Sequence, residues 1–247
     1  MRHLTWAYGK DRSSGEIRRM AKSVFLHFST VAVDAIRIPV IIRNNIDRYV
    51  TAEGIEHLET AVAEGKGVIL ITGHFGNWEL LGTWLAQKGY PLKVVGTSAY
   101  DPRLDNMIVE TRNKAGYFNI ARGKGTREII RCLRNGQLIG MLIDQDTSVE
   151  GVFVQFFGRW AHTATGPAVL AQKFKCPVVP IFIRLRRDLT YRIECQSAIT
   201  LSQTGEEETD ILTNTQKCSD AIEQMIRRYP AQWVWMHERW KKQKERG

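Results

Sequence analysis

Hydrophobic residues recur along this chain with two spacings, and the change from one to the other predicts helices and strands in turn. Between residues 17 and 36, apolar side chains return every three or four positions, which is the period of an amphipathic helix. Ser13 and Glu16 have the spacing of a capping box that would begin this helix, and Pro39 is expected to end it. The apolar stripe would pack either on the protein's own core or on a membrane surface.

After this helix, short apolar runs alternate with helical segments. The run Val68–Thr72 is bracketed by glycine and is too short for a helix, so it predicts a buried strand. Further strands are predicted at 92–96, 117–121, 138–143, 178–185 and 191–199, the last two as a hairpin. Helices are predicted at 53–63, 77–88, 102–114, 126–135, 166–174 and 206–228. This alternation predicts an α/β fold with a mainly parallel, helix-covered sheet.

The pattern contains no repeat, low-complexity segment or linker, so we expect a single domain over residues 1–247. It would consist of a helical N-terminal part (1–50), an α/β core that carries the chemistry (51–200) and C-terminal helices (201–247). Ordinary composition, with 43% hydrophobic and 25% charged residues, excludes a disordered or fibrous chain.

Cysteine spacing and hydropathy indicate in which cellular compartment the protein is found. The four cysteines have no Cys-x-x-Cys spacing, so we expect neither a zinc ribbon nor a redox pair, but reduced thiols of an intracellular protein. The first 15 residues lack the apolar core of a secretory signal. Because His27, Asp34 and Arg37 interrupt the most apolar window, no membrane-spanning helix is expected.

Positive charge is concentrated at the two ends of the chain. Residues 1–50 carry 9 basic and 4 acidic side chains and residues 227–247 carry 7 and 2, while the rest is close to neutral. Such ends would attract nucleic acid, anionic lipid or an acidic protein, or would simply keep the chain soluble. Nucleic-acid binding is disfavoured, because no nucleic-acid motif is present and the basic excess is terminal.

The first candidate site comes directly after the strand at 68–72. There the sequence reads Gly73-His74-Phe75-Gly76-Asn77-Trp78-Glu79, and two glycines allow a tight strand-to-helix turn, where sites form in such sheets. With His74 before the helix and Glu79 in its first turns, the carboxylate would reach back to the imidazole and make a general-base pair. The two residues alone leave open a core histidine beside an unrelated surface glutamate.

Other catalytic motifs are missing from the sequence. It contains neither Gly-x-Ser-x-Gly nor a phosphate-binding Gly-x-x-x-x-Gly-Lys-[Ser/Thr] loop. The histidines are scattered and the acidic cluster Asp144-Gln145-Asp146 is weak as a motif, so no metal site is predicted. A histidine base without a protein nucleophile fits direct transfer, in which a deprotonated substrate hydroxyl attacks an activated carbonyl.

Five blocks of the sequence resemble a known family. His74–Glu79 resembles the His-x4-Glu/Asp motif of the glycerolipid acyltransferase superfamily, and is most similar to that of the bacterial lipid A biosynthesis (late, lauroyl/myristoyl) acyltransferases. The other blocks come in the family's order: Tyr117–Arg122, the stretch from Asp144 to Gly166, Pro177–Arg184 and Tyr229–Lys241. The resemblance covers nearly the whole chain and implies a glycerolipid acyltransferase-like fold.

The resemblance also implies a reaction. A fatty acyl chain would pass from an acyl carrier protein thioester, or alternatively from acyl-CoA, to a hydroxyl of an already acylated glucosamine lipid, without an acyl-enzyme and without a further cofactor. Carried over by motif, His74 is the base and Glu79 its orienting partner.

Further site residues are carried over in the same way. Arg122 and Arg159 would hold phosphate or the developing oxyanion. The alternative is that they are surface arginines paired with carboxylates, without a part in the reaction. Asn77 would contribute a hydrogen bond in the turn, and Asp144 and Gln145 would shape the substrate site rather than bind metal.

The family's location implies partners. Members act at the cytoplasmic face of the bacterial inner membrane, where basic residues meet anionic lipid, and the Trp- and Lys-rich C-terminal segment would suit a bilayer surface. Members usually begin with a hydrophobic anchor; here Arg2–Tyr8 resembles the segment that normally comes after this anchor, so we expect peripheral attachment or an anchor outside this chain. The alternatives are another acceptor, such as a phosphatidylinositol mannoside or an aminolipid, and a non-catalytic binding module.

Overall fold

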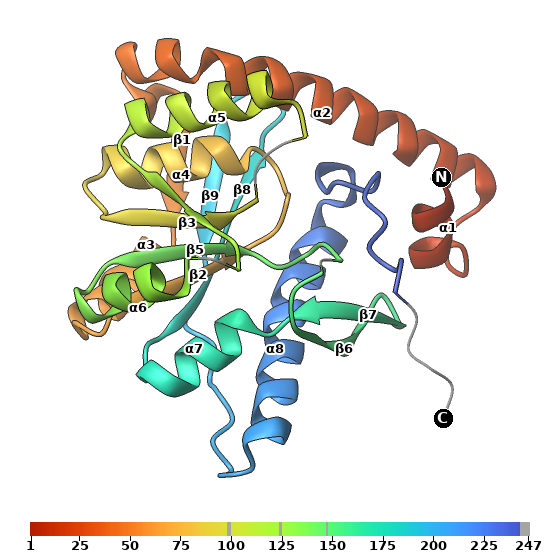
Figure 1. Cartoon of the computed structure of the whole chain (residues 1–247). Coiled ribbons are helices and arrows are strands. Elements are labelled where there is room, and N and C mark those ends of the chain that lie inside the picture. Colours follow the sequence, from red (N-terminus) through yellow and green to blue (C-terminus); the bar gives the residue numbers. More distant parts are fainter. Residues whose placement is uncertain (98–99, 124, 147, 243–247) are drawn as a thin grey trace.

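A central sheet organises the protein. The computed structural model describes residues 1–97, 100–123, 125–146 and 148–242. In this part of the chain seven strands form one sheet in the order β1-β9-β8-β2-β5-β3-β4, and β6 and β7 form a separate hairpin (Figure 1). The strands are β1 (Val50–Glu53), β2 (Val68–Thr72), β3 (Leu92–Gly96), β4 (Phe118–Ala121), β5 (Leu138–Leu142), β6 (Gly151–Phe156), β7 (Arg159–Ala164), β8 (Val178–Leu185) and β9 (Tyr191–Cys195).

Most of this sheet is parallel. β2 lies between β8 and β5 and is parallel to both, with Ile69 opposite Ile139 and Val178. β9 returns antiparallel to β8 as a hairpin, and β1 joins its outer edge in parallel. The prediction of a mainly parallel α/β sheet is confirmed, because each strand from β2 to β5 is followed by a helix or long connection that returns the chain to the same edge.

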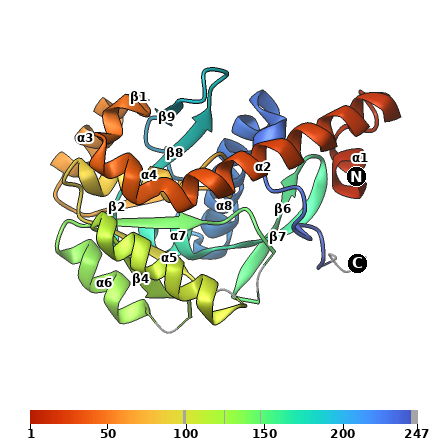
Figure 2. The same cartoon turned by 90° about the horizontal axis from the view of Figure 1, so that it is seen from above.

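Helices cover both faces of the sheet (Figures 1 and 2). Side chains of β2 alternate between two clusters: Ile69 and Ile71 face α6, α7 and α8, whereas Val68 and Leu70 face α3, α4 and the C-terminal part of α2. The helices are α1 (Arg2–Tyr8), α2 (Ser14–Arg43), α3 (Ile55–Ala63), α4 (Trp78–Gln87), α5 (Pro102–Ala115), α6 (Thr126–Arg134), α7 (Gly166–Phe174) and α8 (Glu207–Arg228), with single 3-10 turns at Ile46–Arg48 and Pro230–Gln232.

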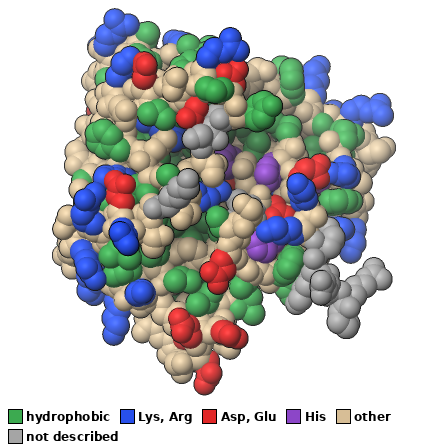
Figure 3. Space-filling view, viewed as in Figure 1, with side chains coloured by type: hydrophobic (Ala, Val, Ile, Leu, Met, Phe, Trp, Pro, Cys, Tyr) green, Lys and Arg blue, Asp and Glu red, His purple; other side chains and the backbone are tan. Residues whose placement is uncertain are grey.

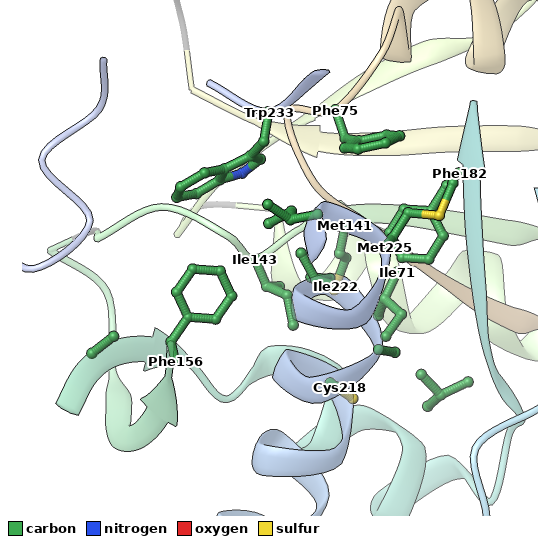
Figure 4. Packing of buried hydrophobic residues seen from close by; sticks show 14 of the residues in the cluster. Ile71, Phe75, Met141, Ile143, Phe156, Phe182, Cys218, Ile222, Met225 and Trp233 are labelled. Carbon is green, nitrogen blue, oxygen red and sulfur yellow. The ribbon is translucent and has the colours of Figure 1, made fainter. Parts of the chain in front are cut away.

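One of these clusters joins the sheet to the C-terminal segment. Figure 4 shows Ile71 and Met141 from adjacent strands packed against Ile222 and Met225 of α8. Trp233, which comes after α8, lies at the upper edge of the same cluster. The chain after α8 is therefore part of the core and packs beside the ends of β2 and β5.

α2 differs in part from the sequence-based expectation. The capping box at its start is confirmed, with Ser13 N donating to Glu16 Oε2 at 2.8 Å. Pro39 does not end the helix, which continues to Arg43. Proline removes one helical hydrogen bond, but burial of Ile38 and Ile41 on either side of it holds the last turns against the domain.

By length and hydropathy α2 is also a candidate membrane span. Its most apolar 18-residue window has a mean hydropathy of 1.6, so the expectation that no helix qualifies is corrected. In the structure one face of α2 packs on the protein and the other is exposed.

Several elements differ from the prediction. β1 and the β6–β7 hairpin are additional strands, β9 ends at Cys195 rather than at residue 199, and the chain after α8 is a 3-10 turn followed by irregular structure rather than helix. The four cysteines are buried and unpaired, as expected of reduced thiols.

Candidate active site

The turn after β2 carries His74 and depends on glycine. Gly76 has φ +58°, and a Cβ there would overlap the carbonyl oxygen of Ile183. A Cβ on Gly73 would lie 3.1 Å from the carboxyl carbon of Asp144. Both glycines therefore let the backbone turn sharply while it remains in contact with neighbouring strand ends.

Asp144 is the carboxylate that meets His74. It comes after β5, the neighbour of β2, and its Oδ1 lies 2.9 Å from His74 Nδ1, while its Oδ2 accepts the backbone N–H of His74 at 2.7 Å. Because a carboxylate only accepts, Nδ1 carries the ring proton, and in the neutral imidazole Nε2 is left as the acceptor. His74 lines a cavity, whereas the side chain of Asp144 is fully buried.

The environment keeps Asp144 ionised. Burial on its own would raise the pKa of this carboxyl, but the positive charge available on His74 and the hydrogen bonds from His74 and Trp233 hold its pKa below the ordinary value. The Trp233 indole Nε1–H donates to Oδ2 at 2.7 Å. An ionised, immobilised acceptor of this kind fixes the tautomer of the imidazole and stabilises the imidazolium.

The expected contact between Glu79 and His74 is wrong. Glu79 lies in the first turn of α4, where its carboxylate accepts hydrogen bonds from Arg112 Nε at 2.8 Å, from Arg112 Nη2 at 2.5 Å and from the Tyr117 hydroxyl at 2.9 Å. A bidentate guanidinium, this phenol and the indole N–H of Trp78, 3.0 Å from Oε1, satisfy the carboxylate, which makes no hydrogen bond with His74. Glu79 and His74 nevertheless line the same cavity.

Four of the predicted site residues converge on this cavity of about 130 Å³. They are His74, Glu79, Arg122 and Gln145. Arg122 is half-buried, and burial lowers the pKa of its guanidinium although the charge of Asp144 acts in the opposite direction. Its side chain has no hydrogen bond or ion pair with the described residues, so it can bind an anion in the cavity.

A second, more apolar cavity adjoins the first. It has a volume of about 280 Å³ and shares Arg122, Gln145 and Leu142 with the His74 cavity. Its apolar lining comes from β5, α6 and α7, and includes Met141, Ile129, Val169 and Leu170. The two cavities together offer a polar reaction centre beside an apolar compartment.

Two predicted residues lie elsewhere. Asn77 is fully buried and caps α4, its Oδ1 accepting the backbone N–H of Leu80 at 3.1 Å, so it shapes the turn without lining either cavity. Arg159 is exposed, with its guanidinium 4.5 Å from the centroid of the Trp6 ring, and it too lies outside both cavities.

Sequence reasoning missed several contributors. Arg112 and Tyr117 hold Glu79, and Trp233 holds Asp144. Trp233, Trp235 and Trp240 were expected at a bilayer surface but are buried. Among the described residues no three His, Cys, Asp or Glu side chains are grouped to hold a metal ion; Asp146 instead pairs with His162 and the backbone of Lys242.

The face of the protein seen in Figure 3 is mixed in charge. Figure 3 shows histidine side chains near the middle of this face, with Lys, Arg and acidic side chains around them. Acidic side chains gather at the lower end, where α8 begins (Figures 1 and 3).

Comparison with known proteins shows the family of this chain. Residues 2–242 match the bacterial lipid A biosynthesis acyltransferases. The chain is 30% identical over 185 residues to a lipid A biosynthesis acyltransferase of Haemophilus influenzae, covering 74% of this chain and 56% of the relative. It is 26% identical over 220 residues to a phosphatidylinositol mannoside acyltransferase of Mycobacterium tuberculosis (84% and 66%) and 24% identical over 212 residues to the lipid A biosynthesis lauroyltransferase of Escherichia coli (81% and 64%).

The chain thus spans between about half and two thirds of the length of these curated relatives. The match nevertheless extends over both termini of the described structure and includes every block that builds the His74 cavity. The chain belongs to the bacterial lipid A biosynthesis acyltransferase family.

Proposed function

We propose that this protein transfers a fatty acyl group from a thioester to a hydroxyl of a lipid A precursor or a related membrane glycolipid. The observation that carries the proposal is the His74–Asp144 pair, whose imidazole lines a polar cavity that shares Arg122, Leu142 and Gln145 with an apolar cavity. Family membership supports the reaction class.

The residues support a direct transfer. His74 Nε2 takes the proton of the acceptor hydroxyl as its oxygen attacks the thioester carbonyl, and Asp144 stabilises the imidazolium that forms. The carbonyl oxygen becomes an oxyanion, which Arg122 can stabilise because its guanidinium lines the cavity without an ion pair to any described residue. The tetrahedral intermediate then expels the thiolate, which takes the proton from His74 and leaves as a thiol.

Glu79 has a supporting part in this proposal. With Arg112 and Tyr117 it forms a satisfied cluster that joins α4 to α5 and to the segment before β4 along one wall of the cavity. This places its carboxylate beside the reactants without a hydrogen bond to the base.

We assign the acyl chain to the apolar cavity. Each methylene group moved from water into such a compartment contributes about 0.8 kcal/mol, so the depth of the cavity behind Arg122 would select chain length. Acyl carrier protein, an acidic protein, is the proposed donor because of the basic chain ends, with acyl-CoA as the alternative.

The acceptor is proposed at the level of a membrane glycolipid. Relatives of similar identity are named for lipid A and for phosphatidylinositol mannoside acylation, so both acceptor classes are candidates. A lipid A precursor is the first choice because the family match is to lipid A enzymes.

The exposed face of α2 supports attachment to a bilayer surface, which we place at the cytoplasmic side of the inner membrane. Phe25, Leu26, Val33, Ile36 and Val40 project from this face and are 38–71% exposed. On its opposite face the carboxylate of Asp34 accepts a hydrogen bond from the Tyr191 hydroxyl at 2.8 Å inside the protein. A helix held to the domain on one side and apolar on the other suits the membrane interface better than a span.

The test is acyl transfer to a panel of acceptors presented in detergent micelles. Labelled acyl groups on carrier protein and on coenzyme A are supplied with a lipid A precursor, a phosphatidylinositol mannoside and an aminolipid, using wild type and His74→Ala. Product from wild type that His74→Ala abolishes is the expected result. Unchanged turnover in His74→Ala would overturn the mechanism, and lipid binding without thioester consumption would favour a non-catalytic binding module.

A further inference from the structure

The segment after α8 contacts the His74 turn through its backbone. Val234 N donates to the carbonyl oxygen of His74 at 3.2 Å, and Gly76 N donates to the carbonyl oxygen of Gln232 at 2.9 Å. Phe75 forms an isolated antiparallel bridge with Trp233. This segment thus lies along the turn that carries the base, although more than 150 residues separate the two in sequence.

One side chain of the segment reaches the base pair itself. Trp233 is fully buried, and its indole Nε1–H donates to Asp144 Oδ2 at 2.7 Å. Oδ2 thereby accepts two N–H groups, from Trp233 and from the backbone of His74, while Oδ1 is left for His74 Nδ1. The division of donors fixes the rotation of the carboxylate about its Cβ–Cγ bond.

Neighbouring rings hold the indole in this position. The ring centroid of Trp233 lies 4.7 Å from that of Trp235 and 5.6 Å from that of Phe156, both edge-on. Figure 4 shows Trp233 above Phe156 and beside Phe75. Because a buried indole N–H without an acceptor is costly, the packing and the hydrogen bond to Asp144 support each other.

We propose that Trp233 is a positioning residue for the general base. It acts through Asp144. Its N–H orients the carboxylate that selects the tautomer of His74, and it stabilises part of the negative charge that the imidazole also faces. The inference rests on the proposed acyl transfer, and it assigns a catalytic purpose to the docking of the C-terminal segment.

The test compares Trp233→Phe with Trp235→Phe. Phenylalanine keeps an aromatic ring and deletes the N–H donor in both variants, but the Trp235 N–H donates to the carbonyl oxygen of Pro230, 2.6 Å away and outside the base pair. Trp233→Phe is expected to lower kcat about 10- to 100-fold with KM within about twofold, the loss typical of a hydrogen bond to a charged group. Because phenylalanine at position 235 keeps an aromatic ring against Trp233 and the Trp233 N–H is untouched, Trp235→Phe is expected to retain wild-type kcat within about threefold.

Two further readouts separate positioning from mere packing. Without the indole donor, the carboxylate of Asp144 keeps more of its negative charge and stabilises the protonated imidazole more strongly. The acidic limb of the kcat/KM profile should therefore move to higher pH in Trp233→Phe and stay in place in Trp235→Phe. Nitrogen-15 NMR of the histidine rings should show a changed His74 tautomer balance in Trp233→Phe alone. If Trp233→Phe fails to fold, a benzothienyl analogue of tryptophan at this position removes the N–H from an otherwise similar ring system.

The outcomes are distinct. Equal kcat, equal pH profiles and equal His74 spectra in the two variants would overturn the positioning role. Absence of turnover in wild type would count against the proposed function instead, and the NMR comparison would still decide whether Trp233 orients the pair.

Discussion

Replacing Asp144 by asparagine should disable the base while leaving its surroundings nearly unchanged. The aspartate offers two acceptor oxygens to three N–H groups, those of the His74 backbone, the His74 ring and Trp233. Asparagine offers one oxygen and one NH2 group. The amide must therefore present its NH2 group either to the ring or to the other two donors.

The first orientation is favoured. With its oxygen in the place of Oδ2, asparagine keeps both the backbone and the indole hydrogen bond, and its NH2 group faces His74 Nδ1. The reverse orientation would leave two buried donors facing an NH2 group, at about 1–3 kcal/mol each. In the favoured orientation Nδ1 must accept, so the ring proton moves to Nε2 and the nitrogen that should take the substrate proton is already protonated.

The expected result for Asp144→Asn is a kcat reduced on the order of 10³- to 10⁴-fold, as for other wrong-tautomer variants of such pairs, with KM little changed. Release of thiol from the acyl donor measures the rate, and nitrogen-15 NMR of the histidine rings reports the tautomer. Asp146→Asn is the matched control, because Asp146 lies two residues further on and outside both cavities. A near-normal rate and tautomer in Asp144→Asn, with loss of both in Glu79→Gln, would refute the reasoning and restore Glu79 as the partner.

Further variants test oxyanion stabilisation, the membrane contact and the stability of the fold. Arg122→Ala should lower kcat about 10²- to 10³-fold through loss of oxyanion stabilisation, measured by the same thiol release. Phe25→Ser and Ile36→Ser should each weaken binding to anionic lipid vesicles about tenfold in sedimentation assays, since each removes a large exposed apolar side chain, whereas Leu212→Ser on α8 should not. Burial lowers the pKa of His27 to about 4, against a hydrogen bond with the Gly76 backbone that raises it. Its neutral form is favoured in the fold, so stability is full above an unfolded pKa of about 6.5 and declines as pH falls toward 4, by on the order of 2 kcal/mol between pH 7 and pH 5. Urea unfolding at the two pH values should show this loss in wild type and a smaller one in His27→Leu.

Local pattern was enough to predict the strands and helices of the sheet. Each predicted element between Val68 and Arg228 has its own hydrophobic period, and the glycines and caps that bound it lie within a few residues. β1 was missed because it takes its place only through pairing with β9, about 140 residues later. The β6–β7 hairpin was missed although each of its strands has six residues, because it interrupts the alternation of strands and helices on which the prediction rested. The order of the strands in the sheet could not be predicted from local sequence patterns either.

The candidate site also has residues that local sequence identifies and residues that only the fold brings together. His74 was identified because seven consecutive residues determine the turn that exposes it. Its partner was not, because the choice between Glu79 and Asp144 depends on whether β5 lies beside β2 and on what else competes for each carboxylate. Arg112, 33 residues after Glu79, binds that carboxylate and so removes it from competition. Trp233 was misassigned to the bilayer because a tryptophan-rich segment has the same composition in a core as at an interface.

The pairing of Asp144 with three donors from two segments links catalysis to complete folding of the chain. A buried carboxylate is strongly unfavourable unless it is hydrogen-bonded, and here one of its three donors belongs to the segment that docks after α8. If that segment detached, Asp144 would lose the indole N–H and the His74 turn would lose its contact with Val234. Because the same event would free the carboxylate and the turn that it orients, partly folded forms of this protein should be inactive well before the sheet itself is lost.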